Sequence, residues 1–183
     1  MLRLALTLLG LVPGIATYSS AAASLDNSAQ QRIRAATFEV VQLKPEEGAI
    51  ITYDRPPPME LVPYQERMDK YRFVGTAFAI GANRYASAGY VFALGMGSRY
   101  GPPALRDASG NVYEIDRIWK YSDREDFVVF SIRTEPKDVQ PLELGPTPAV
   151  NDAVLAVGNA LGQGVVVRDG ASTSDTPEEQ SGQ

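Results

Sequence analysis

The sequence predicts an all-β fold: an antiparallel barrel of about six strands over residues 35–133, followed by a fragment of a second barrel over residues 150–170. Two observations support this prediction. Short runs of β-branched, aromatic and aliphatic residues recur at roughly ten-residue intervals with turn residues between them, which is typical of a barrel or a sandwich. In one run, Val112–Ile118, apolar and polar side chains alternate with the period of a half-buried strand.

Residues 1–23 are expected to be an export signal that is cleaved. A basic residue, Arg3, precedes an apolar stretch over 4–16, and small residues at 20–23 offer a cleavage site. An apolar run this short, and broken by a Pro-Gly pair, is a poor membrane span. The alternative is an N-terminal helix that stays attached. With the signal removed, residues 24–34 would be a linker and the protein would be periplasmic or secreted.

The strands of the first barrel are expected, in chain order, at 35–43, 50–53, 73–80, 84–88, 112–118 and 126–132. Turn residues at Gly81–Asn83 and at Asp107–Asn111 separate two pairs of them. Residues 59–71 are expected to form a loop with one helical turn. A second helical turn is expected at Val91–Leu94, and the glycine-rich segment 95–103 should be a loop.

Three segments follow the first barrel. The proline-rich residues 134–149 are expected to connect the two barrels, and residues 152–158 and 165–168 to form a hairpin that opens the second one. Residues 171–183 hold no large apolar side chain, so a disordered tail is expected there. The usual partners of the hairpin strands are not expected within this sequence, which would leave an exposed edge, a hazard for aggregation, and marginal stability.

Composition excludes several classes of function. The formal net charge is −5, without a basic stripe, which argues against nucleic acid as a partner. The sequence contains no cysteine and no histidine, so disulfides and thiolate sites are absent and zinc would need carboxylates alone. We therefore expect no cofactor and no metal.

Three motifs occur in an order that resembles the trypsin-like serine peptidases, which have the chymotrypsin fold and include the bacterial HtrA-type enzymes. Gly75–Ile80 is followed by Arg84–Val91, similar to the strands that lead to the catalytic base of that family. Asp126–Phe130 is similar to the strand start that carries the catalytic aspartate. Asp152–Gly162 is similar to the valine-rich strand and the Gly-Asn/Tyr-Pro-x-Gly run that open the second barrel. The resemblance implies a chymotrypsin-like antiparallel β-barrel, covering the N-terminal portion of such a peptidase.

The same resemblance places two residues in the site, and the first departs from the family pattern. Tyr90 stands at the position of the triad base, and Asp126 at that of the triad acid, which we expect to be vestigial. In such a triad an imidazole accepts the serine proton and passes it to the leaving amine. A tyrosine phenol, with an ordinary pKa of about 10, accepts a proton poorly near neutrality. No motif for the serine nucleophile follows, so no proteolytic activity is expected of this chain.

Plainer interpretations stand beside each of these assignments. Without the resemblance, Tyr90 would be a packed aromatic residue and Asp126 a turn or capping residue. Ser87 and Ser131 lie in expected strands without a base, which excludes both as nucleophiles. Trp119, with two nearby tyrosines, is expected to pack at the barrel end rather than to form an exposed patch.

Three hypotheses for function follow from the resemblance. The first is a truncated, degenerate member of an exported trypsin-like peptidase family, without activity of its own. The second is a pseudoprotease retained as a binding module, which would hold an extended peptide or a partner protein by pairing along a strand edge. The third is a fragment of a peptidase that is active only with a missing C-terminal half. We expect no nucleic-acid partner and no membrane span after signal cleavage; the oligomeric state stays open.

Overall fold

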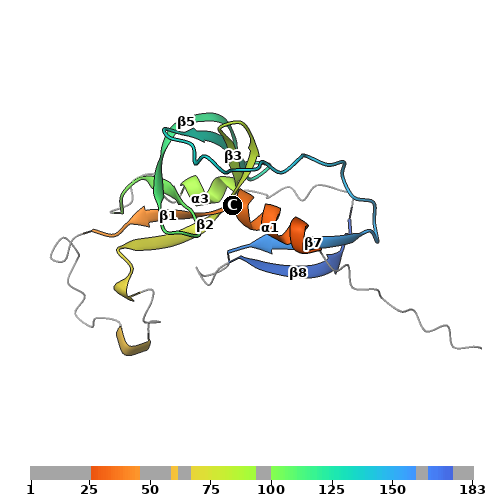
Figure 1. The fold of residues 1–183 in the computed structure, drawn as a ribbon, viewed down its shortest axis with the longest axis horizontal. Coiled ribbons are helices and arrows are strands. Elements are labelled where there is room, and N and C mark those ends of the chain that lie inside the picture. The colour runs from red at the N-terminus through yellow and green to blue at the C-terminus, as the bar shows by residue number, and fades with distance from the viewer. Residues whose placement is uncertain (1–25, 46–58, 62–66, 94–99, 160–164, 175–183) are drawn as a thin grey trace, which may run out of the picture.

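Six antiparallel strands close into a barrel in the computed structural model, which describes residues 26–45, 59–61, 67–93, 100–159 and 165–174. The strand order is β1-β2-β3-β6-β5-β4, and this barrel forms the left and upper part of the molecule in Figure 1. The strands are β1 (Thr37–Leu43), β2 (Tyr71–Gly81), β3 (Arg84–Ser87), β4 (Pro103–Arg106), β5 (Val112–Ser122) and β6 (Phe127–Ile132). The predicted all-β class and chymotrypsin-like barrel are confirmed.

The barrel interior is filled by the inward-facing residues of the strands and by one short helix, α3 (Gly89–Ala93). Aromatic rings occupy its centre: Tyr85 contacts Phe38 edge-on and stacks on Phe130, which also contacts Phe92. These four residues are at most 6% exposed. The predicted helical turn after Tyr90 is therefore a wall of the core, and it fixes the position of Tyr90 itself.

The N-terminal segment is the main correction to the expected domain boundaries. Where a linker was expected over 24–34, the helix α1 spans Asn27–Ala36, and the first strand begins only at Thr37. The side chain of Asp26 accepts a hydrogen bond from the backbone N–H of Ala29 at 2.7 Å, which caps the helix. The run Ala-Gln-Gln-Arg-Ile-Arg-Ala-Ala that follows consists largely of good helix formers.

Two further elements differ from expectation. No strand is expected from the sequence between 95 and 111, yet Pro103–Arg106 forms β4 and pairs with both β1 and β5. Proline is tolerated there because it is the first residue of the strand. The second expected strand, at 50–53, lies outside the described residues, as do the expected signal at 1–23 and most of the expected tail.

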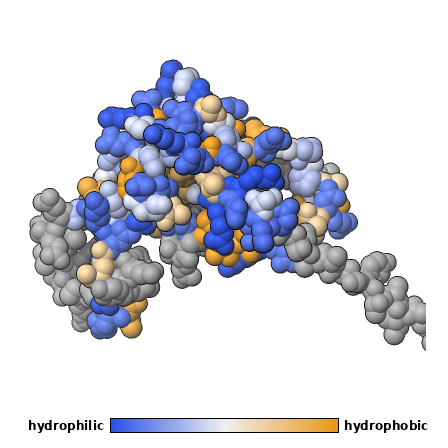
Figure 2. Space-filling view, viewed as in Figure 1, coloured by the Kyte–Doolittle hydropathy of each residue, from blue (hydrophilic) through white to orange (hydrophobic). Residues whose placement is uncertain are grey.

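A separate two-stranded sheet follows the barrel. Residues 134–149 contain no helix or strand, but Val139 and Leu142 pack against the barrel core, so this connection is anchored. The strands β7 (Ala153–Gly158) and β8 (Val166–Ala171) then form the predicted antiparallel hairpin. All six residues of β8 are exposed. Figure 2 shows apolar side chains gathered low on this face, where the hairpin lies in Figure 1.

Within the described segments, no helix is both long and apolar enough to cross a membrane.

Candidate functional site

The fold places the carboxylate of Asp126 against the backbone of Tyr90, a residue 36 positions earlier in the chain. The backbone N–H of Tyr90 donates a hydrogen bond to Oδ1 of Asp126 at 2.8 Å. This N–H lies in the first turn of α3, where backbone donors have no partner within the helix. The two residues that the sequence predicts for the site are therefore brought together, and the contact is made by the backbone amide of Tyr90 rather than by its phenol.

Local sequence explains why the two segments approach so closely. A Cβ atom on Gly89 would lie 3.2 Å from the backbone N of Phe127 and 3.2 Å from the carbonyl oxygen of Ser122, so a side chain there would push α3 away from the β5–β6 turn. Asp126 itself has a positive φ of 48°, a conformation that aspartate tolerates better than most residues. Glycine in the helix and aspartate in the turn together permit the contact.

The side chain of Tyr90 is 55% exposed. Among the described residues its hydroxyl makes no hydrogen bond that would hold the ring against Asp126. The neighbouring residue Val91 faces the opposite way, into the core, and is 1% exposed. It is seated against Gly75 of β2, where a Cβ atom would be only 2.5 Å from the nearer γ-methyl of Val91. The close contact of β2 with α3 thus fixes the helix with Tyr90 facing outward.

Tyr90 lines a hollow of about 430 Å³ between α3, β2 and the end of β7. Its lining is mainly apolar: Phe73, Val74, Phe78, Ala86, Ala88 and Val91, with Gly75, Thr76, Ser87, Gly158 and Asn159. The hollow is therefore lined by residues of both the barrel and the end of the hairpin strand β7. It lies beside Tyr90, the residue that the resemblance places at the position of the base. Apolar concave surfaces with a few polar groups are where proteins usually bind small groups of a ligand.

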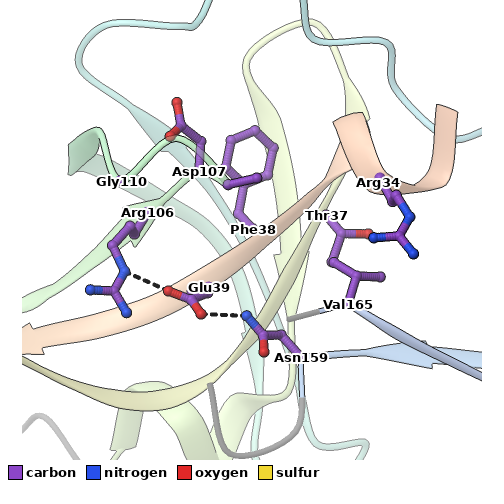
Figure 3. Close-up of a pocket in the computed structure, with 10 residues that line it drawn as sticks. Arg34, Thr37, Phe38, Glu39, Arg106, Asp107, Gly110, Asn159 and Val165 are labelled. Atoms are coloured by element: carbon purple, nitrogen blue, oxygen red, sulfur yellow. Dashed lines mark hydrogen bonds and ion pairs between the residues drawn. The ribbon is translucent and has the colours of Figure 1, made fainter. Parts of the chain in front are cut away.

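A second hollow of about 370 Å³ lies on the other side of Asn159 and is shown in Figure 3. A row of polar side chains runs along its floor. Glu39 of β1 pairs with Arg106 of β4 at 2.5 Å, and Arg106 also pairs with Asp69 at 2.5 Å. The side-chain amide of Asn159 donates to the other oxygen of Glu39, and the backbone N–H of Asn159 donates to Oγ1 of Thr76 at 3.0 Å.

This polar row attaches the hairpin to the barrel. In the strand pairing Glu39 stands opposite both Thr76 and Arg106, so three neighbouring strands present these side chains at one level. Two hydrogen bonds from Asn159 join the end of β7 to the barrel. Asn159 is 4% exposed and lines both hollows.

The electrostatics of the row favour its charged form. Partial burial would raise the pKa of Asp69, but hydrogen bonds from the Tyr71 backbone and from Arg106, with the charge of Arg106, lower it overall. For Arg106, burial opposes the charge while both carboxylates favour it, and the pKa is raised overall. The ion pairs are thus maintained at neutral pH.

The remaining candidate residues have structural partners. Ser87 donates to the backbone carbonyl of Thr76 at 2.8 Å, and Ser131 to Asp116 at 3.4 Å; both serines are buried. In the part of the chain that the structure describes, no group of three or more acidic side chains is arranged to hold a metal ion. Trp119 is 45% exposed and therefore lies on the surface. It had been expected to pack at the end of the barrel.

Sequence reasoning missed Asn159 and Glu39 as partners, because they are 120 positions apart. The Gly158-Asn159 pair carried one signal, since it belongs to the motif on which the resemblance to the second barrel rests. Nothing in the sequence pointed to Glu39, which is one of several charged residues in expected strands.

No protein-family model matches the chain, and no curated protein matches it. Among solved structures, the chain is similar to the HtrA-type protease AlgW with a decapeptide, with a TM-score of 0.55 and 19% identity over 83% of this chain and 46% of that chain. It is also similar to the HtrA-type protease AlgW with a tripeptide, with a TM-score of 0.52 and 16% identity over 83% of this chain and 40% of that chain. The chain thus spans less than half the length of either structure. Likeness at these identities shows the fold alone, which is a chymotrypsin-like β-barrel.

Proposed function

We propose that this protein is an exported, degenerate member of the trypsin-like serine peptidase family that does not cleave peptide bonds by itself. One observation carries the proposal. The carboxylate of Asp126 meets residue 90 of α3, as a triad acid would meet the residue that bears the base, and that residue is a tyrosine with an exposed side chain.

The chemistry of the triad needs a group that accepts a proton from the nucleophile near neutral pH and returns it to the leaving amine. The chain contains no histidine, so no imidazole of its own can serve. Ser87 and Ser131 are buried and donate to other groups, which leaves neither available to attack a substrate. A retained acid without a base is the pattern expected of a degenerate site.

The experiment is a hydrolysis assay on the purified chain with fluorescently labelled casein, run beside Asp126→Asn and beside active trypsin. We expect no release of fluorescent fragments above the buffer rate from either form of the chain, at concentrations where trypsin digests the substrate fully. Hydrolysis that rises with the concentration of the chain and falls in Asp126→Asn would overturn the proposal, because it would show a working acid–base system at this site.

A second candidate function, that of a peptide-binding module, is favoured by the open apolar hollow beside Tyr90. Tyr90 exposes its ring at the rim, and Phe73, Val74 and Phe78 line the interior, which suits an apolar side chain of an extended peptide. The test is the fluorescence anisotropy of a labelled decapeptide of alternating valine and serine. The control is Leu144→Ala, because Leu144 is 80% exposed in the connection between the barrel and the hairpin. Binding that weakens in Tyr90→Ala but not in the control supports this function. Equal binding to both variants contradicts it.

A further inference from the structure

The outer surface of the barrel carries a cationic and aromatic cluster that the peptidase-like site does not use. It consists of Arg84 at the start of β3 and of Arg117 and Trp119 on β5. The guanidinium carbons of Arg84 and Arg117 lie 4.0 and 4.2 Å from the centre of the Trp119 ring. Both arginines therefore make cation–π contacts with one indole, which holds two positive charges close together.

Neither arginine of this arginine–tryptophan cluster forms an ion pair with a carboxylate among the described residues. Arg84 donates to the backbone carbonyl of Asn83 at 3.0 Å, and Arg117 is exposed. Two like charges held on one ring repel each other, and their energy falls when an anion binds between or beside them. The cluster is thus organised for a negatively charged group.

Three acidic residues, on β5 or beside the start of β3, have partners outside the cluster. Glu114 pairs with Arg133 at 2.8 Å, Asp116 accepts from Ser131, and Glu135 accepts from the backbone N–H of Asn83 at 2.7 Å. On the same strand, exposed Lys120 adds a third cation to the two of the cluster. Arg84, Arg117 and Lys120 thus lie on β3 and β5, the two strands on either side of β6, in a chain whose net charge is −5.

The same segment of β5 also offers a free strand edge. The β4 strand pairs only with Val112–Glu114, whereas β6 pairs with β5 between Ile115 and Ser122, with register shifts at Ile115/Arg117 and at Ile118/Lys120. In the part of the chain that the structure describes, the second half of β5 therefore has a strand neighbour on one side only. Along it Ile118, Trp119 and Tyr121 are 51%, 45% and 37% exposed. Unpaired backbone groups beside exposed apolar side chains are what an added strand recognises.

We propose that the free edge of β5 and the arginine–tryptophan cluster bind an extended peptide segment rich in aspartate or glutamate. The edge supplies backbone hydrogen bonds, the aromatic and aliphatic side chains contact the apolar residues of the peptide, and the arginines contact its carboxylates. The free edge favours a peptide over a nucleic acid, which has no backbone N–H to pair with a strand. The negative net charge of the chain further disfavours a polymer with a charge on every unit.

Trp119 is the only tryptophan of the chain, so its fluorescence reports on this surface directly. The probes are two capped decapeptides, alternating glutamate with valine and lysine with valine. We expect the glutamate peptide to change the Trp119 emission in a saturable and salt-sensitive way, and the lysine peptide to bind at least about tenfold more weakly. Equal binding of the two peptides, or binding of neither, would overturn the proposal; the second result would mean that the charges only protect the edge from aggregation.

Variants locate the site. In Arg84→Gln/Arg117→Gln we expect the glutamate peptide, followed by the anisotropy of a fluorescein label, to bind about tenfold more weakly, because two charge-assisted contacts are lost. Arg72→Gln is the matched control, since Arg72 contacts the ring of Tyr100 at 4.8 Å elsewhere on the barrel, and its affinity should be unchanged. Equal weakening in both variants contradicts the site.

Two further probes separate edge pairing from simple charge attraction. A glutamate peptide with alternate backbone nitrogens methylated keeps its charge but cannot pair along a strand, so its binding should be largely lost. Retention of its full affinity would refute the edge. A ten-nucleotide oligothymidylate that binds more tightly than the glutamate peptide would refute the peptide as partner in favour of a nucleic acid. The wild-type measurements with these probes remain decisive even if a variant fails to fold.

Discussion

The contact of Gly75 with Val91 offers the sharpest test of how the barrel positions the candidate site. In Gly75→Ala the new Cβ atom would lie 2.5 and 2.8 Å from the two γ-methyls of Val91 and 3.2 Å from its Cβ. Carbon atoms in contact are ordinarily about 3.5–4.0 Å apart. Something must therefore move, and both partners are held: Gly75 pairs with Val40 in the closed barrel, and Val91 is buried.

The magnitude follows from the two clashing methyl groups. Overpacking a well-packed core costs about 1–3 kcal/mol, and we expect Gly75→Ala to lower the free energy of unfolding by about 3 kcal/mol. Val91→Ala alone removes two buried methyl groups, at about 0.8 kcal/mol each, and leaves a small cavity. The double variant restores space for the alanine at 75, since only the 3.2 Å contact remains. It should be about as stable as Val91→Ala alone.

The assay is urea unfolding of the four proteins in this cycle, followed by far-UV circular dichroism and by Trp119 emission. Gly145→Ala is the control, because nothing lies within 4 Å of a Cβ atom there; its stability should stay within about 0.5 kcal/mol of the wild type. If the effects of Gly75→Ala and Val91→Ala are additive in the double variant, the two residues are not in contact and the account of how α3 is positioned is wrong.

Two other variants test separate parts of the structure. Partial burial raises the pKa of Asp107, but hydrogen bonds led by those of Asn111 lower it overall. The ionised carboxylate therefore stabilises the fold at pH values above its unfolded pKa of about 3.9. This contribution is lost as the pH falls through the lower pKa of the folded state. Asp107→Asn should therefore show a shallower loss of stability on acidification, and an unchanged acid profile would refute the role. Asn159→Ala should speed amide hydrogen exchange in β7 and β8 by about fivefold or more, with little change in the barrel, since it removes the side-chain bond to Glu39; equal exchange in both forms would show that the hairpin is held by other contacts.

The sequence predicted five of the six barrel strands because these strands are rich in β-branched, aromatic and aliphatic residues and two pairs of the expected strands are separated by turn residues. The alternation in Val112–Ile118 and the turn at Asp107–Asn111 were both read from local patterns, and local patterns are what a strand and its turn require. The helix α1 was missed because its apolar face is narrow: of its ten residues only Ala36 is buried, so hydrophobic periodicity gave little signal. The β4 strand was missed because four residues beginning with proline do not read as a strand.

The candidate site divides in the same way. Tyr90 and Asp126 were proposed together from a resemblance in motif order, and the structure brings them into contact. The role of the Tyr90 amide was not accessible, since a backbone donor depends on where the helix begins and not on the side chain. Asn159 and Glu39 form their bond only after the barrel and the hairpin have formed, and Trp119 reaches the surface because β5 continues past its pairing with β4. Such contacts depend on tertiary packing, which local pattern does not contain.

The contact between Tyr90 and Asp126 is the central claim of this account, and nuclear magnetic resonance of the ¹⁵N-labelled chain tests it most directly. In Asp126→Ala the backbone amide proton of Tyr90 should change its chemical shift and exchange faster with solvent, because it loses the carboxylate to which it donates, while the other core amides keep their positions. A Tyr90 amide with the same chemical shift and the same exchange rate in Asp126→Ala would show that the two residues do not meet in solution and that the candidate site is not formed.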